Sequence, residues 1–156
     1  MVVSEYMTPE PFVMSECEPL AEVAEVLRRG GIRQIPITDE SNRLVGIVTD
    51  RDVLCVLGNQ DPRKVKLKAR DIMTTELVTV TPTTRLEEAL EILSRERFAA
   101  LPVVVCGYVV GMLSKQDLLR RFLDLLCEQD MEPVSRTAAL IHGRPLRHDL
   151  GVPYAG

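Results

Sequence analysis

The chain has 156 residues, of which 46% are hydrophobic and 27% charged, and its formal net charge is −4. This length suits one compact body of two halves and is too short for a large enzyme with separate cofactor and substrate domains. The surplus of acidic residues argues against a dedicated nucleic-acid binder, because such a protein needs excess Lys and Arg to neutralise phosphates.

No apolar run reaches the ~18 residues that a membrane helix needs, and the Met1 end lacks a signal-peptide pattern. Neither His142 nor His148 stands at a metal-ligand spacing from a cysteine, so no zinc site is predicted. The four cysteines are far apart, with no C-x-x-C pair: Cys17, Cys55, Cys106 and Cys127. Free thiols in a chain without a signal sequence indicate the cytoplasm.

The chain contains the same pattern twice. Residues 7–52 align with residues 73–117 at a constant offset of 66, which falls to 65 after one hairpin. Two copies of this length predict a paired, pseudo-symmetric module rather than a solenoid.

In the first copy, an extended piece at Phe12–Met14 precedes a helix whose first position suits Pro19. Apolar residues at a spacing of three and four predict its buried face, namely Leu20, Val23, Ala24 and Leu27. Gly30-Gly31 can end this helix. Two strands follow, at Gln34–Thr38 and Leu44–Thr49, and a second helix starts near Asp50.

The second copy follows the same plan. Thr84 and Glu87 form an S/T-x-x-E capping pattern before the next apolar helix. Strands are predicted at Leu101–Val105 and Tyr108–Leu113, joined by a tighter turn. Each copy therefore reads strand, helix, strand, strand, helix, which predicts an α/β (α+β) fold. We expect a first domain at 1–60, a linker at 61–70, a second domain at 71–128 and a C-terminal extension at 129–156.

The predicted linker carries a basic run that is compatible with a solvated linker or with a phosphate-binding patch: Arg63, Lys64, Lys66, Lys68 and Arg70.

The last helix, from Lys115 to about Glu128, has an apolar stripe wider than one small domain needs to bury. Core packing is predicted for Leu118, Leu119 and Phe122. For Leu125 and Leu126, core packing and a subunit interface are equally compatible with the pattern.

A hydroxyl and a carboxylate recur three residues apart at the end of each third strand, as Thr49/Asp52 and Ser114/Asp117. This spacing is typical of a helix start, where it has a purely structural role. A helix start also presents free N–H groups to an anion, and a carboxylate can accept hydrogen bonds from ribose hydroxyls. Both interpretations remain open. No His or Cys accompanies the motif as a base or nucleophile, so we do not expect an enzyme.

Three cations stand near these motifs: Arg33, Arg51 and Lys115. Each could contact a phosphate, although a surface role explains Arg33 equally well. Pro36 and Pro102 lie near strand starts, where the missing N–H either breaks the ladder beside a ligand or simply marks an edge.

The combined motifs resemble the CBS domain. The chain has D-x-M-T at Asp71–Thr74 (a variant at Glu5–Thr8), an apolar-Pro-apolar strand in each copy, and G-h-h-[ST]-x-x-D at the end of each copy. The resemblance covers residues 3 to about 120. Two such domains in tandem are similar to a Bateman module.

The resemblance implies a regulatory module that binds AMP, ADP or ATP, and in some members S-adenosylmethionine or NAD, between the two domains. It implies no required cofactor, a homodimer with closing helices at the interface, and an unidentified regulated partner. A dimerisation or interaction module without a ligand is the alternative. Carried onto this sequence, the first site comprises Thr49, Asp52, Arg51, Arg33, Ile35 and Pro36, and the second comprises Ser114, Asp117, Lys115, Leu101 and Pro102. Base pockets would be lined by Val13, Met14, Thr79 and Val80.

The two sites are not expected to be equal. The second copy has Ala99-Ala100 where the first has Arg33-Gln34, and its turn lacks the acidic residue that Asp39 supplies in the first. We therefore expect the first site to prefer the more highly phosphorylated ligand.

Overall fold

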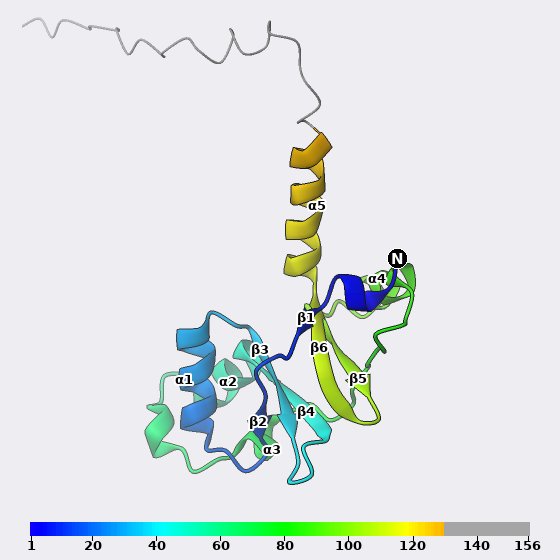
Figure 1. The fold of residues 1–156 in the computed structure, drawn as a ribbon. Coiled ribbons are helices and arrows are strands. Elements are labelled where there is room, and N and C mark those ends of the chain that lie inside the picture. Colours follow the sequence, from blue (N-terminus) through cyan, green and yellow to red (C-terminus); the bar gives the residue numbers. More distant parts are fainter. Residues whose placement is uncertain (130–156) are drawn as a thin grey trace, which may run out of the picture. The chain divides into compact units, whose positions relative to one another are not determined.

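The computed structural model describes residues 1–129, which form two three-stranded sheets flanked by helices (Figure 1). The first sheet has the order β2-β3-β4 and the second β1-β6-β5. The strands are β1 (Thr8–Pro9), β2 (Met14–Ser15), β3 (Gln34–Thr38), β4 (Leu44–Thr49), β5 (Ala100–Val105) and β6 (Tyr108–Ser114). The helices are α1 (Leu20–Gly30), α2 (Asp50–Leu57), α3 (Ala69–Ile72), α4 (Leu86–Arg95) and α5 (Lys115–Gln129), with short 3-10 turns at Val3–Glu5 and Pro62–Lys64. The predicted α+β architecture of two pseudo-symmetric units is confirmed.

In the first unit, α1 begins directly after Pro19, which precedes the helix instead of occupying its first position. It ends at Gly31, whose left-handed backbone (φ 60°) stops the helix as predicted. Strands β3 and β4 pair antiparallel, with Gln34 opposite Thr49. Thr49 therefore lies beside the start of β3.

In the second unit, the start of α4 is where the apolar pattern placed it, but the predicted capping box is wrong. The residue before the helix is Arg85, which makes no side-chain cap. The Thr84 hydroxyl instead accepts a hydrogen bond from the N–H of Thr81 at 3.0 Å. Thr84 lies one residue too early because Arg85 continues the extended segment and forms a β-bridge with Val2.

The opening segments of the two repeats are exchanged between the sheets. Strand β1 pairs with β6, with Thr8 opposite Met112, although β1 opens the first repeat. In the same way Thr74, which opens the second repeat, bridges Ile47 of β4. The apolar cores follow this exchange, because Val3 is buried in the second core and Ala69 in the first.

Two glycines permit this close approach. An added Cβ at Gly46 would overlap the side chain of Met73, and one at Gly111 would overlap Met7. Each methionine opens one repeat and lies over the other repeat's sheet. A side chain at either glycine would therefore displace the exchanged segment.

Helix α5 was predicted to pack into a core through Leu118, Leu119 and Phe122. Leu118 does pack against the second core. The prediction is wrong for Leu119 and Phe122, whose side chains are 59% and 57% exposed, because in the described chain no core residue covers them. The C-terminal extension predicted at 129–156 lies outside the described residues after Gln129.

Candidate functional site

The strand-to-helix junction of the first repeat is closed by reciprocal hydrogen bonds. The hydroxyl of Thr49 accepts from the N–H of Asp52 at 3.1 Å, as an N-cap does. In return, Asp52 Oδ2 accepts from the N–H of Thr49 at 2.8 Å and from its hydroxyl at 2.7 Å. Within residues 1–129, Asp52 Oδ1 accepts no hydrogen bond, so one carboxylate oxygen remains available. The capping role and an acceptor role are thus compatible.

The second junction repeats this arrangement with an added contact. The Ser114 hydroxyl accepts from the N–H of Asp117 at 3.0 Å and donates to Asp117 Oδ2. Thr8, from the exchanged strand β1, donates its hydroxyl to the same oxygen at 3.2 Å. The opening segment of the first repeat is therefore part of the second junction.

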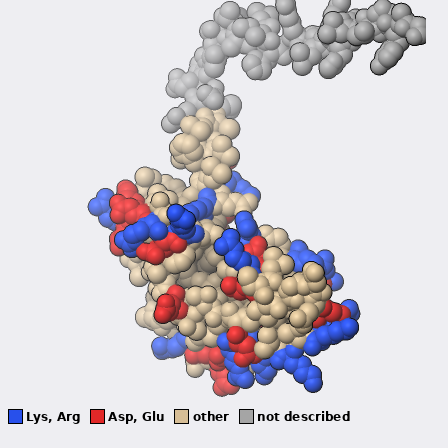
Figure 2. Space-filling view, turned by 180° about the vertical axis from the view of Figure 1, so that it is seen from behind, with Lys and Arg blue, Asp and Glu red and all other residues tan. Residues whose placement is uncertain are grey.

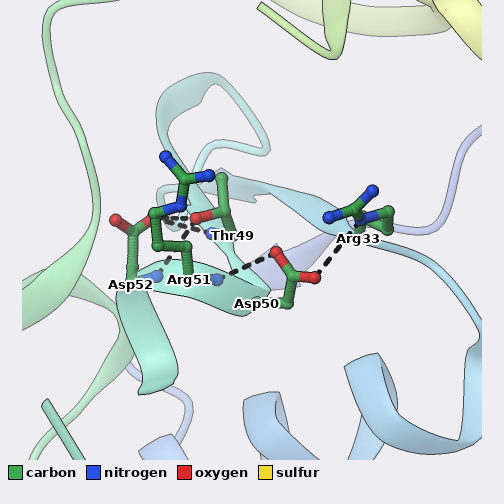
Figure 3. A network of polar contacts seen from close by, with 5 residues as sticks. All are labelled: Arg33, Thr49, Asp50, Arg51 and Asp52. Atoms are coloured by element: carbon green, nitrogen blue, oxygen red, sulfur yellow. Dashed lines mark hydrogen bonds and ion pairs between the residues drawn. The ribbon is translucent and has the colours of Figure 1, made fainter. Parts of the chain in front are cut away.

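An ion pair distinguishes the first junction (Figure 3). Arg33 Nε lies 3.3 Å from Asp50 Oδ2, and Asp50 Oδ1 accepts from the N–H of Arg51 at 2.8 Å. The main chain fixes this pairing, because the N–H of Asp50 donates to the carbonyl of Arg33 at 3.0 Å. In the second repeat the N–H of Lys115 donates to the carbonyl of Ala99 at the same distance. The second junction therefore has a single cation where the first has a neutralised pair.

Two cavities straddle the repeats. We call the first the Thr49 pocket and the second the Ser114 pocket; their volumes are about 470 and 490 Å³. Sites for small organic ligands and cofactors span roughly 300–1,000 Å³, so each can hold a nucleotide-sized molecule. The Thr49 pocket is lined by Arg33, Gln34, Ile47, Thr49, Asp50, Arg51, Thr74, Glu76, Leu77, Val78, Arg97, Phe98, Ala99, Ala100, Pro102 and Lys115. The Ser114 pocket is lined by Thr8, Pro11, Phe12, Gly31, Ile32, Arg33, Gln34, Pro36, Ala99, Ala100, Met112, Ser114, Lys115, Gln116 and Asp117.

The prolines lie in the opposite pockets from those expected from sequence order. Pro102 lines the Thr49 pocket and Pro36 lines the Ser114 pocket. The reason is that the start of a strand from the other repeat, β5 for the Thr49 pocket and β3 for the Ser114 pocket, lines part of each cavity. Arg33 and Lys115 line both pockets, so neither cation belongs to one site alone.

Several predicted base-contacting residues lie elsewhere. The side chains of Ile35 and Leu101 are fully buried in the two cores, because alternate residues of a strand point to opposite faces. Met14 and Val80 are also buried in the cores. The remaining predicted residues that line neither cavity are Val13, Thr79 and Asp52. Asp52 is half-buried and follows the lining residue Arg51 directly.

The sequence interpretation missed four lining residues of chemical interest: Asp50, Glu76, Arg97 and Phe12. A signal was present for Arg97, since it aligns with Gly31 at the helix end of the first repeat. The other three carry no local signal, because their position depends on how the two repeats pack together.

The basic run near the predicted linker lines neither pocket. Its first arginine forms an ion pair with Asp61 at 3.0 Å. The hydrogen bond from the Arg63 side chain holds the pKa of Asp61 below its usual value. Arg63 is exposed, Asp61 is partly exposed, and neither residue lines a cavity.

On the molecular face seen in Figure 2, acidic and basic side chains gather in separate clusters between stretches of uncharged surface.

A family model for the CBS domain matches the chain twice, at residues 3–59 and 69–124. The chain belongs to the CBS domain family. Its two copies form the tandem pair that is termed a Bateman module, as the motifs predicted.

The chain is similar in sequence to several known proteins. An uncharacterised 17.7 kDa protein of Acidianus ambivalens is 30% identical over 132 residues, which cover 84% of this chain and 79% of that protein. Other curated relatives are longer, and the chain spans 35%, 62% and 49% of three of them.

Two similar structures contain adenosine derivatives. CBSX2 from Arabidopsis thaliana, solved in complex with AMP, is 27% identical with a TM-score of 0.70 and aligns with 80% of this chain and 97% of its own. The CBS domain pair of MJ0100, solved with 5′-methylthioadenosine and S-adenosyl-L-methionine, is 25% identical with a TM-score of 0.67 and aligns with 78% and 95%. Adenosine-containing ligands thus occur in two proteins of this fold.

Within residues 1–129, no group of three or more His, Cys, Asp or Glu side chains is placed to hold a metal ion. The helices in that part of the chain are also too short or too polar to span a bilayer.

Proposed function

We propose that this protein is a regulatory module that binds adenosine-containing ligands in the Thr49 and Ser114 pockets and transmits their presence to a partner protein. The observation that carries the proposal is the pair of nucleotide-sized cavities, each beside a hydroxyl–carboxylate junction and lined by cations. The ligands found in CBSX2 and MJ0100 support the choice of an adenosine derivative. Regulation follows if the ligand favours one arrangement of the two repeats over another.

The junction geometry suggests how a nucleotide would be held. Both hydroxyls already donate to the neighbouring carboxylate, so they orient that carboxylate and leave phosphate binding to the cations. The proposed acceptors for ribose hydroxyls are Asp117, which lines the Ser114 pocket, and Asp52, which directly follows the lining residue Arg51 and keeps Oδ1 free. Carboxylates are strong acceptors when they are held by hydrogen bonds in a fixed orientation. Arg33 and Lys115 reach phosphate from either pocket.

The linings support unequal ligand preferences. The Thr49 pocket has four cations and two carboxylates, whereas the Ser114 pocket has two cations and one carboxylate. The Ser114 pocket also includes apolar side chains at Pro11, Phe12, Ile32 and Met112. We therefore propose that the Thr49 pocket takes ADP or ATP and that the Ser114 pocket takes AMP or a less charged derivative such as S-adenosylmethionine or NAD.

A thermal-shift series with AMP, ADP, ATP, S-adenosylmethionine and NAD tests the proposal. A ligand at one hundred times its dissociation constant should stabilise the folded protein by about 2.7 kcal/mol. For a chain of this size, each kcal/mol raises Tm by roughly 2–4 °C. Asp117→Asn should reduce the shift, while Asp61→Asn, which makes the same charge change outside both pockets, should not. A flat response to all five compounds would refute ligand binding.

A second candidate is an interaction module that has no ligand. It is favoured by α5, where Leu119, Phe122, Leu123 and Leu126 share one helical face and are all 43–59% exposed. Figure 2 shows mostly uncharged surface on the face of this helix that is turned to the viewer. We propose that this face forms a homodimer, because two copies of one apolar stripe can pair about a two-fold axis. If the protein is an interaction module without a ligand, Asp117→Asn should change the stability of the fold and no binding property.

Catalysis is not part of the proposal. Neither cavity is lined by a His or Cys side chain, the two residue types sought as base or nucleophile, among the described residues.

We also propose the cytoplasm as the location. The four cysteines are exposed free thiols, which is typical of proteins from a reducing compartment.

A further inference from the structure

Arg97 has an unusual backbone conformation at the wall of the Thr49 pocket. Its φ angle is 57°, in the left-handed region that disfavours side chains with a Cβ. The aligned residue of the first repeat is Gly31, with a φ angle of 60°, and it lines the Ser114 pocket. The same backbone bend therefore bears a guanidinium at one pocket and no side chain at the other.

Arg97 also contributes to the difference in charge between the pockets. Two of the four cations of the Thr49 pocket, Arg33 and Lys115, line both cavities, so only Arg51 and Arg97 are specific to the first. Arg33 is already paired with Asp50. Within residues 1–129, the Arg97 side chain makes no ion pair or hydrogen bond, so its guanidinium is free to bind a ligand.

A structural explanation for Arg97 is that a cation near the end of α4 interacts favourably with the helix dipole. Arg95 already supplies a cation in that last turn, where it pairs with Glu96. A glycine at position 97 would also adopt the observed bend without strain. The helix end alone therefore gives no reason for an arginine there.

We propose that Arg97 is the residue that makes the Thr49 pocket selective for nucleoside di- and triphosphates, by binding the phosphate farthest from the ribose. This inference rests on the proposed nucleotide binding and adds the source of its selectivity. A guanidinium suits this role because its planar fork can donate two parallel hydrogen bonds to phosphate oxygens. Gly31 leaves the Ser114 pocket without an equivalent donor, which suits a monophosphate or the less charged derivatives proposed above.

The test replaces Arg97 with the residue of the other repeat. Two-site calorimetric titrations with ATP and with AMP are compared for the wild type and Arg97→Gly. ATP affinity at the ATP-selective site should fall by about 10- to 100-fold, the range for hydrogen bonds to a charged group, while AMP affinity should change by less than about threefold. Arg95→Ala removes the same charge from α4 outside both pockets and should change neither affinity.

Thermal unfolding without ligand separates binding from folding. Arg97→Gly should unfold at the same temperature as the wild type or higher, because glycine adopts this backbone freely. In Gly31→Arg, no atom lies within 4 Å of the added Cβ, and the ATP-to-AMP affinity ratio of the Ser114 pocket should rise. An unchanged ratio in Arg97→Gly, with both nucleotides still bound, overturns the role of Arg97 and leaves nucleotide binding intact. A wild type that binds neither nucleotide overturns both proposals.

Discussion

The exchange of opening segments makes a quantitative prediction at Gly46. The Cβ of alanine at this position would lie 2.6 Å from Cγ and 2.9 Å from Cβ of Met73, well inside ordinary van der Waals contact. Because the methionine Cβ cannot move without its main chain, the segment must shift, and overpacking of this kind costs about 1–3 kcal/mol. Gly46→Ala should therefore lower Tm by about 2–12 °C in differential scanning calorimetry.

A double-mutant cycle identifies the cause of this loss. Met73→Ala removes the atoms beyond Cβ, so the double variant should be less destabilised than the sum of the single variants, with a coupling of about 0.5–3 kcal/mol. Gly30→Ala in α1 is the matched control, because its added Cβ approaches only the flexible side chain of Ile32, at 3.3 Å. Its stability should be unchanged or slightly higher. Strictly additive effects of the Gly46 and Met73 changes would refute the clash.

Three further predictions concern the pockets, the dimer and the surface charge. Lys115→Ala should weaken AMP and ATP binding at both sites in the same calorimetric titration, since this cation lines both cavities; an effect on one site alone would contradict the shared position. Phe122→Asp should convert a homodimer into a monomer in analytical ultracentrifugation, because a carboxylate cannot be buried unpaired in an apolar interface; an unchanged sedimentation coefficient would exclude the α5 interface. Arg63→Ala should raise the pKa of Asp61 towards its ordinary value of 3.8 in an NMR titration, because the lost hydrogen bond favours the ionised form; no change would show that Arg63 does not perturb it.

Most of the secondary structure was predictable because it is encoded locally. The strands β3 and β4 match their predicted bounds, since an apolar run, a polar turn and a second apolar run leave little choice of register. The helix end at Gly31 was predictable for the same reason. The N-cap of α4 was harder to predict, because the S/T-x-x-E pattern at Thr84 competed with the β-bridge between Arg85 and Val2, which lies more than 80 residues earlier.

The composition of the pockets was only partly predictable. The hydroxyls Thr49 and Ser114 were identified because they recur at one offset, and both line a cavity. The exchange of Pro36 and Pro102 between pockets was not predictable, because it depends on how one sheet faces the other and leaves no mark on the local sequence. The pair formed by Arg33 and Asp50 was missed for a related reason, since a main-chain bond between distant residues creates it.

The first nine residues pack with the second repeat, although they precede the first in the sequence. Val3 is enclosed by the second core, and Thr8 touches a carboxylate 109 positions further along the chain. Trimming this end, or fusing a bulky tag to it, would thus disturb the Ser114 pocket rather than the neighbouring first repeat. Proteolysis between the repeats would likewise separate β1 from β6 and Thr74 from Ile47, so each piece should regain its structure only when recombined with the other.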